Sequence, residues 1–265
     1  MKLQEKRAAV RFAVPSSLGG DLSARVEQLR GFLSLKLGRE TEVVVPSSYE
    51  ALARELLAGR VDAAWAPPFV CARIEAMGVR VLVRGVRDGS STYRAALVCR
   101  KEATIDLLAL AGATAAWTDR DSVGGYLLPM AYLREKGVNA STAFLKQHFS
   151  GNYKSALEMV LAAQADLTSV FAPRSGETTG LKEIWPEQAD AFRVLAFTAE
   201  APNDGVAVSM NAPASLVSEL ERCFLSMHET PEGTPVLAGC FRAERFEVAP
   251  RMGYRALYRV ALASL

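Results

Sequence analysis

The segment Ala113-Thr114-Ala115-Ala116-Trp117 is followed by Asp119-Arg120-Asp121-Ser122-Val123-Gly124-Gly125-Tyr126 and then by the amphipathic run Leu127 to Leu133. An apolar run, a tight polar turn and an amphipathic run predict a strand, a connection and the start of a helix. The first turn of a helix has N–H groups without intrahelical partners and the positive end of the helix dipole. Adjacent glycines let a ligand approach such a backbone closely. The segment therefore predicts an anion-binding helix start, although an ordinary capped connection has a similar composition.

The same alternation of strands and helices extends on both sides of this segment. Upstream, the pattern predicts strands at residues 8–14, 42–45 and 61–65 and helices at 22–33 and 49–58. Downstream, it predicts strands at 167–171 and 206–210 and helices at 126–135, 154–163 and 214–227. Such alternation implies parallel strands joined by right-handed crossovers, and hence an α/β fold. Residues 79–83 and 93–99 flank an Arg87-Asp88-Gly89 turn and are expected to form an antiparallel element.

Composition narrows the class of function. A chain of 265 residues, half of them hydrophobic, can form one or two domains. A net charge of +2 without a long basic run does not favour a nucleic-acid groove or an anionic membrane surface. The four cysteines have no CxxC spacing and are expected to be buried thiols, and the two histidines, His148 and His228, are far apart. We therefore expect no metal site, no cofactor and no membrane-spanning helix.

Several segments, in the right order, resemble one protein family. They are residues 47–52, 57–65, 92–101, 119–126, 149–153 and 202–208. The turn at 119–126 resembles a ligand loop of the form Asp-x-Asn-Ser-Thr-Ser-Gly-Tyr, and Pro202-Asn203-Asp204 resembles a return crossing that begins Pro-Asn-Asp-Pro. The family is that of the PhnD-like substrate-binding proteins of phosphate, phosphite and phosphonate ABC importers.

The resemblance implies a two-lobed type II periplasmic-binding-protein fold, each lobe a mixed, mostly parallel sheet flanked by helices. Lobe 1 would comprise residues 1–98 and 201–265, and lobe 2 residues 99–200, with two hinge crossings near Val98 and Ala201. A ligand would lie in the cleft between the lobes. The implied function is that of a non-enzymatic solute-binding protein that closes on a small anionic ligand, such as a phosphonate, phosphate or related oxyanion or carboxylate. Its partner would be an ABC permease.

The resemblance also implies which residues bind the ligand. The Ser122 hydroxyl and the N–H groups of Val123, Gly124 and Gly125 would form an anion seat. The full set of expected ligand-binding residues is Tyr49, Tyr93, Ser122, Val123, Gly124, Gly125, Tyr153, Arg174 and Asp204.

This chain departs from the family pattern within that set. Only Ser122 remains of three loop hydroxyl residues, and the loss of two donors would weaken phosphonate binding by about two to four decades unless something compensates. Tyr153 takes the place of the family histidine. Arg174 lies near the acidic position that receives an amino group on some family ligands, and an arginine there would bind a second oxyanion or a carboxylate.

Two other classes of function are compatible with the same fold. An enzyme would use Asp204, Tyr153 and Arg174 as acid, base and electrostatic clamp, and would require Asp204 to face a second ionisable group. A cytoplasmic ligand sensor, or an interaction module that binds no ligand, would also fit the fold. Residues 1–7 are polar and show no signal-peptide core. The protein is therefore expected to be periplasmic or extracellular if a leader has been removed, and cytoplasmic otherwise.

Overall fold

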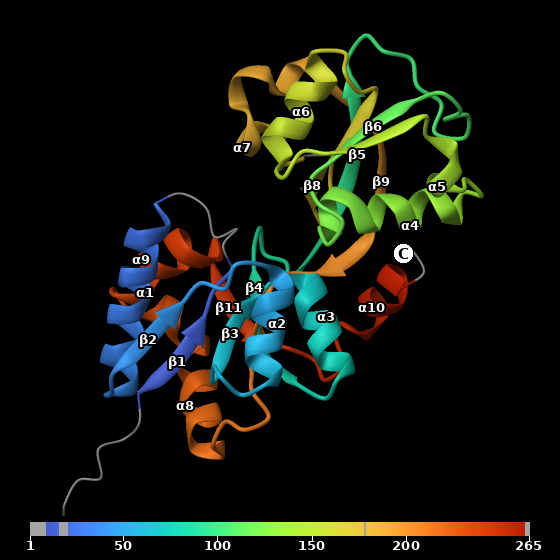
Figure 1. Ribbon diagram of the computed structural model, residues 1–265. Helices are drawn as coiled ribbons and strands as arrows, with labels where there is room; N and C mark the ends of the chain where they lie inside the picture. The colour runs from blue at the N-terminus through green and yellow to red at the C-terminus, as the bar shows by residue number, and fades with distance from the viewer. Residues whose placement is uncertain (1–8, 16–20, 178, 263–265) are drawn as a thin grey trace, which may run out of the picture. The chain divides into compact units, whose positions relative to one another are not determined.

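The computed structural model describes residues 9–15, 21–177 and 179–262. The chain divides into two compact units (Figure 1). Unit 1 comprises Met1–Ser91 and Pro202–Arg255, and unit 2 comprises Thr92–Ala201 and Ala256–Leu265. This division differs from the expected one, because the first crossing precedes residue 92 and the C-terminal segment belongs to unit 2. The expectation about residues 1–7 falls outside the described residues.

Unit 1 is a six-stranded sheet in the order β11-β4-β10-β3-β1-β2. Helix α1 contacts both α8 and α9, whereas α2 and α3 pack together against β3, β4 and β10. The strands are β1 (Val10–Ala13), β2 (Thr41–Val44), β3 (Ala63–Ala66), β4 (Arg80–Val86), β10 (Gly205–Val208) and β11 (Arg245–Val248). The helices are α1 (Leu22–Leu37), α2 (Tyr49–Leu57), α3 (Pro68–Ala76), α8 (Ala214–Leu225), η4 (Met227–Glu229), α9 (Gly233–Val236) and η5 (Leu237–Phe241).

Helix ends in unit 1 follow from local side-chain chemistry. The Asp21 carboxylate accepts the N–H of Ala24 at 3.1 Å and caps α1. Gly38 ends that helix in the left-handed conformation, with φ of 62°, which a glycine adopts without steric cost.

Trp65 lies on the fully buried strand β3, and its ring packs edge-on against Phe241 and Phe246. Trp65 therefore belongs to the core of unit 1.

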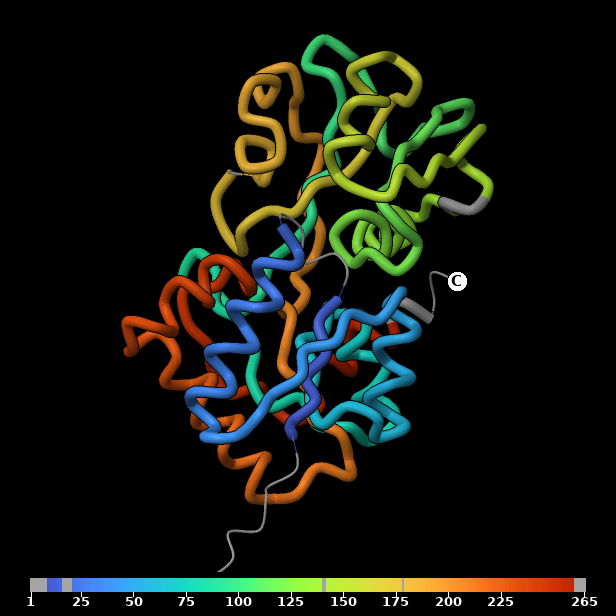
Figure 2. Tube along the Cα trace, turned by 60° about the vertical axis from the view of Figure 1, so that its left-hand side comes forward, coloured from blue at the N-terminus to red at the C-terminus, as the bar shows by residue number. Residues whose placement is uncertain are grey.

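Unit 2 is a five-stranded sheet in the order β7-β6-β8-β5-β9. Helix α6 contacts β5, β6 and β8, and the paired segments η2 and α4 also contact the sheet (Figure 1). The strands are β5 (Thr92–Arg100), β6 (Thr114–Trp117), β7 (Lys146–Phe149), β8 (Leu167–Pro173) and β9 (Phe192–Pro202). The helices are η2 (Val123–Leu127), α4 (Leu128–Glu135), α5 (Ala140–Ala143), α6 (Tyr153–Leu161), α7 (Leu181–Ile184), η3 (Pro186–Ala191) and α10 (Arg255–Leu262). Figure 2 traces the chain through this unit and back to unit 1 along β9.

Both sheets are mixed, as expected. The sheet of unit 1, however, has more antiparallel strand pairs than the expected mostly parallel sheet would have. Strand β1 runs parallel to β2 and β3, whereas β10 is antiparallel to β3 and β4, and β11 is antiparallel to β4. The antiparallel strands β10 and β11 are those formed after the chain returns from unit 2.

The expected antiparallel pairing of residues 79–83 with residues 93–99 is wrong. The turn between them is present, since Arg87 and Ser90 exchange backbone hydrogen bonds of 2.8 and 2.9 Å. However, β4 belongs to the sheet of unit 1 and β5 to the sheet of unit 2. The turn therefore ends one unit, and the next strand pairs with β8.

Candidate functional site

The predicted anion seat is a helix start in unit 2. Ser122 is extended, with φ of −75° and ψ of 116°, and its hydroxyl oxygen accepts the N–H of Gly125 at 3.1 Å. The helix then runs from Val123 through η2 into α4, and the N–H groups of Tyr126 and Leu127 both reach the Ser122 carbonyl at 3.0 Å. The preceding turn is shaped by Asp119, whose carboxylate accepts the N–H of Asp121 at 2.8 Å. The sequence prediction of strand, polar turn and helix is therefore confirmed.

The N–H groups of this helix start are not all equivalent. The Gly125 N–H donates to the Ser122 hydroxyl oxygen in this structure, and the role of Gly125 in ligand binding stays a prediction. Within the described residues, no protein acceptor takes the N–H of Val123 or Gly124. These two groups lie at the positive end of the helix dipole. The predicted seat would therefore offer two backbone N–H groups and the Ser122 hydroxyl, which can still donate its proton while accepting from Gly125.

Two tyrosines lie against Gly124. A Cβ atom on Gly124 would be 2.8 Å from the Tyr153 hydroxyl oxygen and 3.2 Å from Cε2 of Tyr93. Tyr93 lies near the start of β5 and Tyr153 is the first residue of α6, where Asn152 caps the helix by accepting the N–H of Ser155 at 2.9 Å. The Tyr153 ring also packs edge-on against Phe171, with 5.6 Å between ring centroids. The structure therefore brings the two predicted tyrosines to the predicted glycine.

The backbone at the seat is held by polar residues that sequence reasoning missed. The Ser169 hydroxyl, fully buried on β8, donates to the Gly124 carbonyl at 2.8 Å. Thr118 follows β6, and a Cβ on Gly125 would come within 2.0 Å of its hydroxyl oxygen. Position 125 therefore requires glycine. The available signal was a Thr-Ser pair inside the apolar strand at 167–171 and a threonine directly before the polar turn.

Val123 contributes only its backbone. Its side chain is buried, with 4% of its surface exposed. The prediction included Val123 for its N–H group, and the buried side chain is consistent with that assignment. A polar side chain at this position would point into the protein interior.

Arg174 is in an ion pair. It follows β8, and its Nε lies 3.1 Å from Glu200 Oε1, with both side chains well exposed. The Thr92 hydroxyl donates to the other Glu200 oxygen at 2.8 Å. An anion that used Arg174 would have to compete with Glu200.

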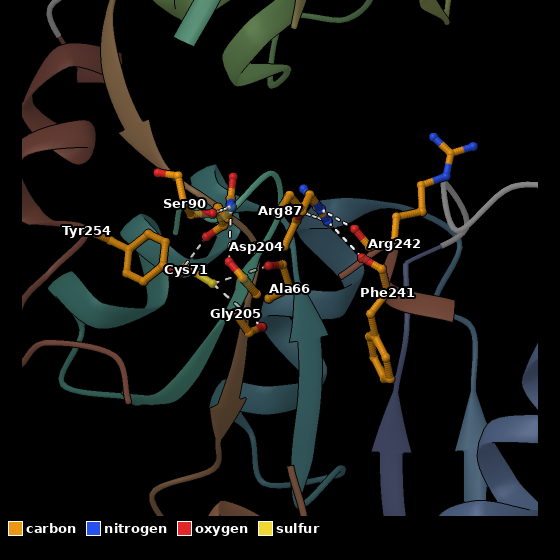
Figure 3. Close-up of polar contacts among 11 residues, drawn as sticks. Ala66, Cys71, Arg87, Ser90, Asp204, Gly205, Phe241, Arg242 and Tyr254 are labelled. Carbon is orange, nitrogen blue, oxygen red and sulfur yellow. Dashed lines mark hydrogen bonds and ion pairs between the residues drawn. The ribbon is translucent and has the colours of Figure 1, made fainter. Parts of the chain in front are cut away.

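The remaining predicted residues, Tyr49 and Asp204, belong to unit 1. Tyr49 is the first residue of α2, directly after Ser48, whose hydroxyl caps that helix by accepting the N–H of Ala51 at 3.0 Å. Asp204 lies between β9 and β10, and its Oδ2 is 2.6 Å from Nη2 of Arg87 (Figure 3). Arg87 also donates to the carbonyls of Phe241 and Arg242, at 3.0 Å each. Asp204 therefore faces a permanently charged cation, which cannot exchange protons with it near neutral pH.

Among the residues that the structure describes, no group of three or more His, Cys, Asp or Glu side chains is placed to hold a metal ion. All four cysteines are free and buried, as expected. Burial, and secondarily the nearby Asp204 carboxylate, raises the pKa of the Cys71 thiol well above its usual value. Cys71 is consequently not an activated nucleophile.

Comparisons with known proteins agree with this fold and with each other. The chain is 26% identical over 207 residues to the phosphate-import protein PhnD of Mycolicibacterium smegmatis, a match that covers 69% of this chain and 64% of that protein. The match therefore spans slightly less than two thirds of the relative. Among the described residues, no helix is both long and apolar enough to cross a bilayer.

Solved structures share the fold across almost the whole chain. A Xanthomonas citri protein bound to ATP has a TM-score of 0.82 at 18% identity, covering 97% of this chain and 98% of that one. A PhnD protein of Prochlorococcus marinus in complex with methylphosphonate has a TM-score of 0.76 at 16% identity, covering 97% of this chain and 99% of that one. A family model for the periplasmic substrate-binding proteins of phosphonate ABC transporters matches residues 12–254. The chain belongs to this family of ABC-transporter substrate-binding proteins.

Proposed function

We propose that this protein is a solute-binding protein that holds one small oxyanion, of the phosphate or phosphonate class, on the anion seat of unit 2. The observation that carries the proposal is the pair of N–H groups on Val123 and Gly124, which start a helix beside the Ser122 hydroxyl and two tyrosines. A tetrahedral oxyanion has several acceptor oxygens and a charge that the helix dipole stabilises.

Tyr153 offers an explanation for the missing hydroxyls of the ligand loop. Its hydroxyl lies 2.8 Å from the place that a Cβ of residue 124 would occupy. A serine at 124 and a tyrosine at 153 would compete for this space, so glycine and tyrosine form a compatible pair. The Tyr153 hydroxyl can then donate to the oxyanion from nearly the same place as a serine at 124. We therefore expect less loss of affinity than a count of loop hydroxyls suggests.

Asp204 and Tyr49, both in unit 1, stay proposed ligand-binding residues. The Arg87 guanidinium compensates the charge of Asp204, so this carboxylate does not require a cationic group on the ligand. The expected ligand is therefore an oxyanion without an amino group. Arg174 would join the ligand only by leaving Glu200.

The protein is further proposed to act without enzymatic chemistry, outside the cytoplasm, and to deliver its ligand to an ABC permease. Support comes from the family's role in transport. An enzyme would need a titrating partner for Asp204, and the group in contact with its carboxylate is an arginine. If no anion bound, the enzyme or the interaction module would be favoured instead.

Calorimetry with phosphate, phosphite, methylphosphonate and sulfate tests the proposal. The variant Gly124→Ala places a methyl group against Tyr153 and Tyr93, and should weaken binding by about tenfold or more, because the oxyanion contacts shift out of hydrogen-bonding distance. Gly31→Ala is the matched control, since a Cβ at Gly31 of α1 has no neighbour within 4 Å. Equal affinities of the two variants, or no binding of any of the four anions to the unsubstituted protein, would refute the proposal.

A further inference from the structure

The aromatic ring of Phe171, on β8, packs against the ring that carries the Tyr153 hydroxyl. The two ring centroids are 5.6 Å apart and the rings meet edge-on, at 71°. Tyr153 starts α6, which contacts β8 within unit 2 (Figure 1). The Tyr153 hydroxyl oxygen in turn lies 2.8 Å from the place that a Cβ of Gly124 would occupy. Phe171 therefore contacts the anion seat through one intermediate residue.

Gly180, which precedes α7, leaves room for the Phe171 ring. A Cβ atom on Gly180 would lie 2.5 Å from Cζ of that ring, 2.6 Å from Cε2 and 2.8 Å from Cε1. Each of these distances is well below van der Waals contact. The Gly180 backbone, with φ of −67° and ψ of 0°, is accessible to other residues. The requirement for glycine at position 180 therefore comes from the Phe171 ring and not from the backbone.

The backbone of Gly180 is fixed on both sides. Its N–H donates to the Phe171 carbonyl at 2.7 Å, and its carbonyl accepts the N–H of Ile184 at 2.8 Å. The next residue, Leu181, is buried in the core of unit 2. A methyl group added at position 180 would therefore displace the Phe171 ring rather than the backbone, and the displaced ring would disturb its contact with Tyr153.

The same face of β8 also holds the backbone of Gly124. Ser169 lies two residues before Phe171, so both side chains are on one face of the strand. The Ser169 hydroxyl donates to the Gly124 carbonyl at 2.8 Å. Strand β8 thus contacts both members of the pair formed by Gly124 and Tyr153, the first through a hydrogen bond and the second through a ring contact.

We propose that Phe171, packed against Gly180, is a positioning residue that holds the Tyr153 hydroxyl at the anion seat. The inference rests on the proposed binding function and adds two residues to that site, neither of which is an expected ligand-binding residue. Phe171 and Tyr153 are both half-buried. A tyrosine ring that is held in place before the anion arrives loses less conformational entropy on binding. Phe171 therefore raises the affinity without touching the anion.

Fluorine NMR of protein that contains meta-fluorotyrosine tests the contact without a ligand. The Tyr153 resonance is the one that disappears in Tyr153→Phe. Gly180→Ala should move this resonance, because displacement of the Phe171 ring changes the magnetic environment of its neighbour. Gly31→Ala on α1 is the matched control and should leave the resonance in place, since a Cβ there has no neighbour within 4 Å.

Phe171→Leu provides a second test if Gly180→Ala fails to fold. Leucine keeps an apolar side chain on β8 but removes the ring that packs against Tyr153, so it should move the same resonance. A Tyr153 resonance that stays in place in the folded variant would overturn the inference.

Calorimetry with phosphate, phosphite, methylphosphonate and sulfate tests the effect on binding. Gly180→Ala should weaken the binding of each anion that binds by about three- to tenfold. In the Tyr153→Phe background the same substitution should leave the affinity unchanged, because the positioned hydroxyl is absent. An equal loss in both backgrounds would overturn the inference, since the effect would not pass through Tyr153.

The two experiments separate this inference from the proposed function. Anion binding together with an unmoved Tyr153 resonance would overturn the inference alone. If none of the four anions bound to the unsubstituted protein, the proposed function would fail, and the inference would fail with it.

Discussion

Replacing Tyr153 with phenylalanine isolates the contribution of one hydroxyl to the anion seat. The ring keeps its edge-on contact with Phe171, and only the oxygen next to Gly124 is lost. A hydrogen bond to a charged group contributes about 1.5 to 3 kcal/mol. The dissociation constant for a phosphate-class anion should therefore rise by about 10- to 150-fold.

Isothermal titration calorimetry at fixed ionic strength measures this change, because surface electrostatics vary with salt. Tyr132→Phe is the control, since it removes a tyrosine hydroxyl from α4 of the same unit. Thermal unfolding without ligand checks that both variants remain folded. A change of less than about threefold in Tyr153→Phe, for every anion that the unsubstituted protein binds, would refute the idea that Tyr153 replaces the missing loop hydroxyls.

Three further outcomes follow from the packing and the charges. Gly125→Ala should lower the free energy of unfolding by about 1 to 3 kcal/mol in urea titrations, because its Cβ would overlap the Thr118 hydroxyl; an unchanged midpoint would contradict the geometry. Arg87→Met should lower the free energy of unfolding by about 1 to 3 kcal/mol, because it leaves the mostly buried Asp204 carboxylate without its cation. Adding Asp204→Asn should restore part of that stability in the same denaturation assay. A double variant no more stable than Arg87→Met would argue against a stabilising ion pair between Arg87 and Asp204. Burial raises the pKa of the Cys223 thiol from 9.0 to about 11, so this thiol ionises at lower pH in the unfolded chain than in the folded protein. The free energy of unfolding should therefore fall as the pH rises from 9.0 to about 11. Cys223→Ala should show a shallower fall, and the same dependence of unfolding free energy on pH in both proteins would exclude this thiol as a cause.

Features that depend on neighbouring residues in sequence could be predicted well. Nearby residues in the sequence determine the capping by Ser122 and the left-handed conformation of Gly38. The helices also begin and end close to the expected positions. The alternation of strands and helices likewise identified the α/β class. Local chemistry determines these features, so the pattern alone suffices.

Features that depend on distant residues could not be predicted in the same way. The pairing of Arg87 with Asp204 joins residues 117 positions apart, and nothing local to either indicates the other. Strand β7, Lys146–Phe149, lacks apolar alternation and forms by pairing beside β6. The bond of the Ser169 hydroxyl to the Gly124 carbonyl likewise joins residues 45 positions apart.

The position of β10 within the first sheet has a consequence for biosynthesis. This strand lies between β3 and β4, yet the ribosome makes it more than a hundred residues after them. Until it emerges, β3 and β4 lack the neighbour that joins them, whereas residues 92–201 are synthesised as one continuous segment. We therefore expect the nascent chain to become resistant to proteases first in residues 92–201. Unit 1 should become resistant only after synthesis has passed Val208.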